Sequence, residues 1–213
     1  MRLRGTLIRL GRFVALGIVA SILGGLWAVP VEARYAAMVV DADTGEVLFS
    51  RNGQAIRYPA SLTKMMTLYL AFDALNSGKL KLDQNLKVSK RAAGQTPSRL
   101  GLKAGRTITT RDAILAMVTK SANDAATVVA EAIGGTEVKF AEIMTSKARS
   151  MGMRRTTFRN ATGLPNRHQR TTAGDMSLLA TALLRDHGNH YHYFSTSKFT
   201  YGGRTYGNHN NLL

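Results

Sequence analysis

One stretch of the sequence, Tyr58 to Leu75, constrains the fold more than any other. Its apolar residues recur at spacings of three and four, which predicts a helix with one buried side. Pro59 suits the first helical turn, and Gly78 is expected to end the helix. Ser61 and Lys64 lie one turn apart at its start, so a hydroxyl and an amine should share a face. The apolar residues are Leu62, Met65, Met66, Tyr69, Leu70, Phe72 and Leu75.

The pairing of Ser61 with Lys64 suggests nucleophilic chemistry. A serine attacks only when a base takes its proton, and a lysine can do so if burial or neighbouring cations keep it uncharged. The same spacing recurs at Ser195 and Lys198, and a polar pair facing solvent is the alternative interpretation of either motif. Context favours Ser61, which opens a long amphipathic helix, over Ser195, which precedes a strand-like run.

The first 33 residues have the pattern of an export signal. A positively charged start precedes an uncharged apolar run from Phe13 to Val29, and Val31-Glu32-Ala33 resembles a cleavage site. We expect cleavage after Ala33, the alternative being an uncleaved membrane anchor, since the run is close to a membrane-spanning length. Either way residues 34–213, expected to form one domain, would lie in the periplasm or on the envelope face of the cytoplasmic membrane.

Charge and composition narrow the choice of partners. The formal net charge is +16. Without the four arginines and one glutamate of residues 1–33, 25 basic and 12 acidic residues remain, a net charge of +13. An exported protein with this thinly spread charge is expected to meet anionic lipid or cell-wall polymer rather than nucleic acid. The chain has no cysteine, which excludes disulfides, a thiol nucleophile and cysteine-based metal sites.

The remaining patterns predict an alternation of hairpins, helices and loops. Strands are expected on both sides of the Asp41–Gly45 turn, at Thr156–Arg159, and on both sides of Gly202-Gly203. Lys79–Thr109 is expected to be a loop-rich boundary between two lobes, because glycine and proline separate it into short pieces, and Asn160–Arg170 is expected to be a loop. Capping boxes at Thr109–Asp112 and Thr172–Asp175, and glycines that end the helices between them, predict further helices. These helices are expected from Thr109 through Val118, from Asp124 to Ile133, from Thr136 to Met151, and from the Thr172–Asp175 capping box onward.

Two polar clusters in this pattern have competing interpretations. Ser121 and Asn123 lie between two predicted helices, where either could simply cap the second helix. Alternatively, the hydroxyl relays a proton and the amide grips a peptide carbonyl in a shared cavity. The histidines from His187 to His192 could bind a metal, but ordinary surface roles are favoured because no carboxylate closely follows them. We predict neither a metal nor a cofactor.

Ser61-x-x-Lys64 followed by Ser121-x-Asn123 in an exported protein resembles the penicillin-recognising serine enzymes. Within that group, the chain resembles a serine D-alanyl-D-alanine carboxypeptidase, a low-molecular-mass penicillin-binding protein of the peptidase S11 family. The resemblance implies an α/β (α+β) fold of the β-lactamase/transpeptidase-like type, a helical cluster packed on an antiparallel sheet. It covers nearly all of residues 34–213 and includes Ala37–Gly45, Tyr58–Thr67, Ser121–Ala126, Thr172–Met176 and Phe199–Tyr206.

The resemblance also implies roles for the four polar residues. Ser61 would attack the carbonyl between two terminal D-alanines of a peptidoglycan stem peptide, with Lys64 as the general base. Ser121 would pass a proton to the departing D-alanine, and Asn123 would hold the substrate amide. β-Lactam antibiotics would be captured because their strained amide presents the same carbonyl.

One element of the family pattern is absent from the sequence. Neither Lys-Thr-Gly nor Lys-Ser-Gly occurs in it, although the family needs this element for an oxyanion-hole amide and for the substrate carboxylate. Losing one oxyanion donor costs on the order of a hundredfold to a thousandfold in rate. We therefore expect a chain that is the N-terminal part of a longer product, lacks the C-terminal sheet strands, has little carboxypeptidase activity alone and exposes a sheet edge and apolar face.

Two other functions compete with this interpretation. A serine β-lactamase shares both motifs but commonly needs a glutamate-activated water, and the nearest candidates, Glu131 and Glu142, lie inside predicted helices. A non-catalytic exported protein could instead bind wall polymer or anionic membrane through its positive charge. The sequence leaves open whether the substrates are single stems or cross-linked dimers, and therefore whether an endopeptidase activity exists.

Overall fold

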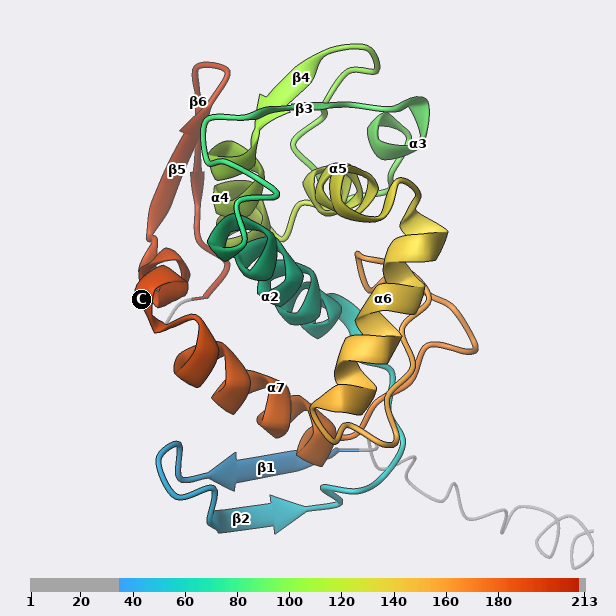
Figure 1. Ribbon diagram of the computed structural model, residues 1–213, viewed down its shortest axis with the longest axis vertical. Helices are drawn as coiled ribbons and strands as arrows, with labels where there is room; N and C mark the ends of the chain where they lie inside the picture. The colour runs from blue at the N-terminus through green and yellow to red at the C-terminus, as the bar shows by residue number, and fades with distance from the viewer. Residues whose placement is uncertain (1–34, 211–213) are drawn as a thin grey trace, which may run out of the picture. The chain divides into compact units, whose positions relative to one another are not determined.

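The computed structural model describes residues 35–210, and the packed unit begins at Ala36. The predicted export segment of residues 1–33 lies outside the described residues. Within the described part of the chain, none of the helices has the length and apolar content to cross a membrane. The elements, labelled as in Figure 1, are β1 (Ala37–Val40), β2 (Val47–Arg51), η1 (Ala60–Leu62), α2 (Thr63–Asn76), β3 (Asn85–Lys87), α3 (Lys90–Ala93), β4 (Thr107–Thr109), α4 (Thr110–Lys120), α5 (Asn123–Gly134), α6 (Glu137–Ser150), α7 (Ala173–Asp186), η2 (Gly188–Ser195), β5 (Lys198–Tyr201) and β6 (Arg204–Gly207).

Helix α2 lies at the centre of the packing, where it contacts α5, α6 and α7 (Figure 1). It follows the short 3-10 turn η1, and Gly78 takes a positive φ of 72° just beyond its end, as the sequence predicts. The prediction of one buried side is wrong. Thr67, Leu68 and Ala71 are buried as well, whereas Leu62 is 54% exposed. A helix surrounded by other helices buries most of its circumference, which the spacing of its largest apolar residues does not indicate.

The later helices begin where the capping signals predict. Thr109 Oγ1 accepts a 3.0 Å hydrogen bond from the backbone N–H of Asp112, and Thr172 Oγ1 accepts one of the same length from Asp175. Thr136 caps α6 in the same way. Such caps satisfy N–H groups that the first helical turn leaves without a partner. Local chemistry therefore fixes the starts of α4, α6 and α7.

Two predicted hairpins are confirmed. β1 and β2 pair antiparallel, and Asp41 Oδ1 organises the turn between them by accepting from the backbone N–H groups of Asp43 and Thr44. β5 and β6 pair across Gly202-Gly203. In the described part of the chain β2 pairs only with β1, and it is exposed along its whole length. Val47, Leu48 and Phe49 are each at least half exposed, so the expected apolar face is present on this hairpin.

Other local predictions are wrong or incomplete. The loop predicted at Lys79–Thr109 contains the short β3–β4 pair and helix α3. Three-residue strands are too short to show an alternating pattern. The strand predicted at Thr156–Arg159 is reduced to one bridge between Thr157 and Arg170. The histidine segment forms the 3-10 helix η2, and His187 just before it is 2% exposed rather than on the surface, because it packs edge-on against Tyr69.

Candidate active site

Ser61 lies in η1, immediately before the first turn of α2. The preceding residue, Ala60, has a φ of 46°, and a non-glycine residue in this left-handed region costs roughly 1–3 kcal/mol. Ser61 is exposed, and in the described part of the chain its hydroxyl makes no hydrogen bond. A strained turn therefore presents the serine hydroxyl to solvent, ahead of the buried helix.

Lys64, in the first turn of α2, is buried instead. Only 4% of the residue is exposed, and its Nζ donates a 2.6 Å hydrogen bond to the backbone carbonyl of Thr162. Burial lowers the pKa of the Lys64 amine from 10.5 to about 8, because the charged form loses its hydration. With that pKa, roughly a tenth of the amine is uncharged at pH 7. Lys64 thus meets the requirement for a general base near neutral pH.

The turn from Asn160 to Leu164 fits closely against the start of α2. Gly163 has a φ of 87°, and a Cβ at this position would overlap the carbonyl group of Ala60. Thr162, the residue before it, provides the carbonyl that binds Lys64. The turn therefore supports both the backbone on which Ser61 lies and the amine of Lys64, and only glycine fits at position 163.

Ser121 and Asn123 lie at the junction of α4 and α5. Ser121 ends α4 in a left-handed conformation with a φ of 55°, and Asn123 is the first residue of α5. The capping interpretation is wrong for both, because Ala122 is the N-cap of α5 and no side chain caps this helix. Asn123 Nδ2 donates to Thr96 O at 2.9 Å, and Ser98 Oγ donates to Lys120 O at 2.7 Å. The segment before β4 thus holds the junction, through one side chain from each of the two.

The Ser61–Lys64 pair and the Ser121–Asn123 pair are connected through helix packing rather than through direct hydrogen bonds. Ser61 and Lys64 share the start of α2, and α5, which begins with Asn123, packs against α2. Among the described residues, no hydrogen bond joins Ser121 or Asn123 to Ser61 or Lys64. Ser121 is half-buried, and Asn123 is 5% exposed.

The other sequence candidates for catalytic or metal-binding roles lack such surroundings. Ser195 Oγ donates to His192 O at 2.8 Å, and Lys198 is exposed on β5. Glu131 lies in α5 and accepts from Ser89 Oγ, while Glu142 is exposed on α6. Within the described residues, no three metal-ligating side chains of His, Cys, Asp or Glu form a group that could hold a metal ion.

Sequence reasoning missed three supporting groups. These are the Thr162 carbonyl, Gly163, and Asp124, which is fully buried and accepts from the backbone N–H groups of Leu100, Gly101 and Leu102. A backbone carbonyl leaves no trace in a sequence. Gly163 within a predicted loop was the one available signal, because an isolated glycine can mark a close backbone approach.

Solved structures share this architecture. A D-alanyl-D-alanine carboxypeptidase DacD from Francisella tularensis is 33% identical with a TM-score of 0.77, covering 83% of this chain and 43% of that one. Penicillin-binding protein D2 from Listeria monocytogenes in its cefotaxime-bound form is 32% identical with a TM-score of 0.73, covering 84% and 73%. The fold is therefore that of the penicillin-binding proteins, an α+β fold of helices with small antiparallel sheets.

Curated relatives agree with the structural matches. D-alanyl-D-alanine carboxypeptidase DacF of Bacillus subtilis is 35% identical over 165 residues, 78% of this chain and 41% of that protein. A D-alanyl-D-alanine endopeptidase of Escherichia coli is 34% identical over 157 residues, 72% and 48% respectively. The chain thus spans less than half the length of these relatives. The family model described as D-alanyl-D-alanine carboxypeptidase, peptidase S11, matches residues 28–213, and the chain belongs to this family.

Proposed function

We propose that the protein is a serine-type D-alanyl-D-alanine carboxypeptidase that acts on peptidoglycan stem peptides and is acylated by β-lactam antibiotics. The observation that carries the proposal is the pair formed by exposed Ser61 and buried Lys64, whose pKa is lowered to about 8. Membership of the peptidase S11 family supports the choice of substrate.

The reaction begins when the uncharged Lys64 amine accepts the Ser61 proton and Oγ attacks the carbonyl carbon between the two terminal D-alanines. The C–N bond then breaks, and Ser121 passes the proton from the Lys64 ammonium to the amine of the departing D-alanine. An ester between Ser61 and the shortened peptide remains. Lys64 then deprotonates a water, which attacks this ester. The peptide acid is released, and the Lys64 ammonium returns the proton to Ser61 Oγ.

Asn123 holds the substrate amide during these steps. Its Nδ2 uses one proton in the bond to Thr96 O, so the second N–H and the Oδ1 acceptor are left for the substrate. A β-lactam presents a strained amide carbonyl to the same serine and forms the same kind of ester. We propose further that residues 1–33 direct export, so that the enzyme works in the periplasm or at the envelope face of the membrane, where its positive charge favours anionic surfaces.

The test uses the full-length gene product with stem peptides ending in D-Ala-D-Ala and, separately, a fluorescent penicillin. Wild-type protein is expected to release D-alanine and to be labelled once per molecule, and Ser61→Ala is expected to do neither. Cross-linked stem dimers in the same assay measure endopeptidase activity. Labelling that persists in Ser61→Ala would show that the nucleophile is another residue.

Nitrocefin separates this function from that of a β-lactamase. A carboxypeptidase opens about one nitrocefin per active site over the time of the assay, whereas a β-lactamase turns over many. Glu131 lies within α5 and accepts a hydrogen bond from Ser89, so it is not on a loop where it could activate a water. Binding to wall polymer with no labelling of any variant would instead favour the non-catalytic alternative.

A further inference from the structure

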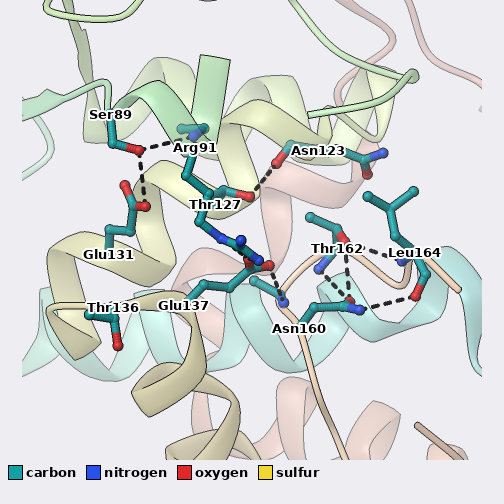
Figure 2. A network of polar contacts seen from close by, with 12 residues as sticks. Ser89, Arg91, Asn123, Thr127, Glu131, Thr136, Glu137, Asn160, Thr162 and Leu164 are labelled. Carbon is teal, nitrogen blue, oxygen red and sulfur yellow. Dashed lines mark hydrogen bonds and ion pairs between the residues drawn. The ribbon is translucent and has the colours of Figure 1, made fainter. Parts of the chain in front are cut away.

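A single asparagine organises the turn that binds Lys64. Asn160 Oδ1 accepts hydrogen bonds from the backbone N–H groups of Thr162 at 3.2 Å and Gly163 at 2.8 Å, and from Thr162 Oγ1 at 3.1 Å (Figure 2). Its Nδ2 donates to Leu164 O at 3.0 Å. One side chain therefore pairs with both N–H groups and a carbonyl group of this backbone. Side-chain bonds of this kind stabilise a local turn, and Asn160 makes four of them here.

Two successive carbonyls of the turn contact α2. Ala161 O accepts from Thr67 Oγ1 at 2.8 Å, and Thr162 O accepts from Lys64 Nζ at 2.6 Å. Lys64 and Thr67 are three residues apart on the helix, and both are buried. The turn is therefore fixed to one face of α2 at two points, so a shift of its backbone moves the carbonyl that binds the amine.

A buried carboxylate anchors the same turn from the other side. Glu137, the first residue of α6, is 2% exposed, and its Oε1 accepts from the backbone N–H of Ala161 at 3.1 Å. Its Oε2 is paired with the Arg91 guanidinium, whose Nε lies 2.7 Å away (Figure 2). A buried charge persists when it is paired and hydrogen-bonded in this way. α6 thus fixes the position of Ala161.

The Thr162 carbonyl limits how the Lys64 amine can be oriented. A neutral amine has two N–H groups and one lone pair, and a carbonyl can only accept, so one N–H must point at Thr162. The lone pair, which takes the serine proton, is then confined to the remaining directions. The same closely packed turn keeps water away from Nζ. Both effects disappear if the turn loses its shape.

We propose that Asn160 is a positioning residue that acts through the Thr162 carbonyl to aim the Lys64 lone pair at Ser61, with Glu137 anchoring the turn. The inference rests on the proposed function, in which Lys64 is the base for Ser61. Asn160 contacts neither reacting group; its effect on the reaction passes entirely through the turn.

The test compares Asn160→Ala with Asn160→Asp and with Asn166→Ala in the full-length protein. Aspartate keeps acceptor oxygens for the backbone N–H groups, loses the donor to Leu164 and adds a negative charge. Asn166 is an exposed residue of the same loop, whose Oδ1 accepts only from the backbone N–H of His168 among the described residues. The acylation rate with fluorescent penicillin is measured from pH 6 to 10, together with the thermal unfolding midpoint.

Asn160→Ala is expected to lower the acylation rate about a hundredfold, since misplacing a reacting group by 1 Å has an effect of that order. The pH of half-maximal rate should rise, because water reaches Lys64 Nζ. Asn160→Asp should recover most of the rate, and Asn166→Ala should match the wild type. A purely structural role predicts instead a lower unfolding midpoint with an unchanged pH profile, and that result overturns the proposal.

A second readout works without catalysis. ¹³C NMR of the lysine side chains, with Lys64 assigned through Lys64→Arg, follows its titration directly, and Asn160→Ala should raise the pKa. If Asn160→Ala does not fold, Asn160→Ser, which keeps a shorter hydroxyl acceptor for the turn, should shift the pKa in the same direction by less. An unchanged Lys64 titration in the folded variants refutes the positioning role. Absence of penicillin labelling in the wild type refutes the proposed function alone.

Discussion

The chain contains two Ser-x-x-Lys motifs whose surroundings are opposite. Lys64 is buried and donates a hydrogen bond to Thr162 O, and burial lowers its pKa to about 8. Ser61 is exposed, and within the described residues its hydroxyl makes no hydrogen bond. Lys198 is exposed at the start of β5, and the Ser195 hydroxyl already donates to a backbone carbonyl. Identical spacing therefore gives two chemically different pairs.

The difference comes from segments far away in the sequence. Thr162 lies 98 residues after Lys64, and the turn that contains it closes over the start of α2. No such segment covers Lys198 in the described part of the chain. A serine and a lysine one turn apart supply a potential nucleophile and base, but burial by a distant turn is what lowers the lysine pKa enough for proton transfer.

Removing each serine hydroxyl in turn should give the largest difference between the two Ser-x-x-Lys motifs. Ser61→Ala is expected to lower the rate of acylation by fluorescent penicillin at least about a thousandfold, because losing a nucleophile removes the whole covalent route. Ser195→Ala, the matched control, should remain within about twofold of the wild type. The measurement is the labelling rate of full-length protein on a denaturing gel. A reversed order of the two variants would move the nucleophile to Ser195.

Substitution of Gly163 tests whether the turn is what distinguishes the two motifs. Gly163→Ala is expected to lower the free energy of unfolding by about 2–4 kcal/mol, from left-handed strain and overlap with the Ala60 carbonyl. Gly105 has a similar φ of 81°, and a Cβ added there would meet no atom within 4 Å, so Gly105→Ala should cost about 1–2 kcal/mol. Urea unfolding measures both.

Acylation separates the two glycine variants further. Gly163→Ala displaces the backbone beside Ser61, so its acylation rate should fall even under conditions where the protein is fully folded. Gly105→Ala should keep the wild-type rate. Equal rates in the two variants would mean that the close fit at position 163 serves stability alone.

Replacing each lysine measures the cost of the buried amine. Because the pKa of Lys64 is lowered on folding, the folded state binds fewer protons than the unfolded chain, and stability declines as pH falls from 10.5 towards 8. At neutral pH, Lys64→Met should therefore raise the free energy of unfolding by about 1–2 kcal/mol while abolishing acylation. Lys198→Met should change neither quantity. A loss of stability in Lys64→Met would mean that leaving the Thr162 carbonyl without a donor costs more than burying the charge.

The sequence predicted the parts of the fold that local chemistry determines. The threonine caps at positions 109, 136 and 172 and the turn at Gly202-Gly203 are each set by neighbours within a few residues. Ser61 and Lys64 were found for the same reason, since one helical turn separates them. The short β3–β4 pair escaped prediction, because three residues of strand carry too little pattern.

The groups that give Lys64 its chemistry could not be read from the sequence. The Thr162 carbonyl is backbone, and the roles of Asn160 and Glu137 depend on which turn they contact. The burial of His187 also differs from the prediction, because it depends on Tyr69 and Phe72 of α2, which pack against its ring, rather than on its own segment. Local patterns identify reactive side chains, whereas long-range packing determines their pKa values.

The smallest expected effect is the pH dependence of stability due to His187, which lies just before the segment that contains Ser195. Burial is the largest influence on this imidazole and lowers its pKa, outweighing the opposite effect of Asp73, whose Oδ1 lies 3.2 Å from Nε2. Nε2 is not aligned for a hydrogen bond in the described part of the chain. The titratable groups that face it from the packed elements are Tyr69, Asp73, Lys147, Asp186 and His190.

Because the folded state disfavours the charged imidazole, the contribution of His187 to stability is complete above pH 6.5 and decreases as pH falls below it. Urea unfolding at pH 7.5, 6.5 and 5.5 should show a small loss of stability that His187→Gln reduces and that His192→Gln, on an exposed residue, leaves in place. The same His187→Gln variant should keep the acylation rate of Ser61, since η2 and the Asn160–Leu164 turn hold different parts of α2. A wild-type slope that His187→Gln leaves unchanged would assign the acid sensitivity to other groups.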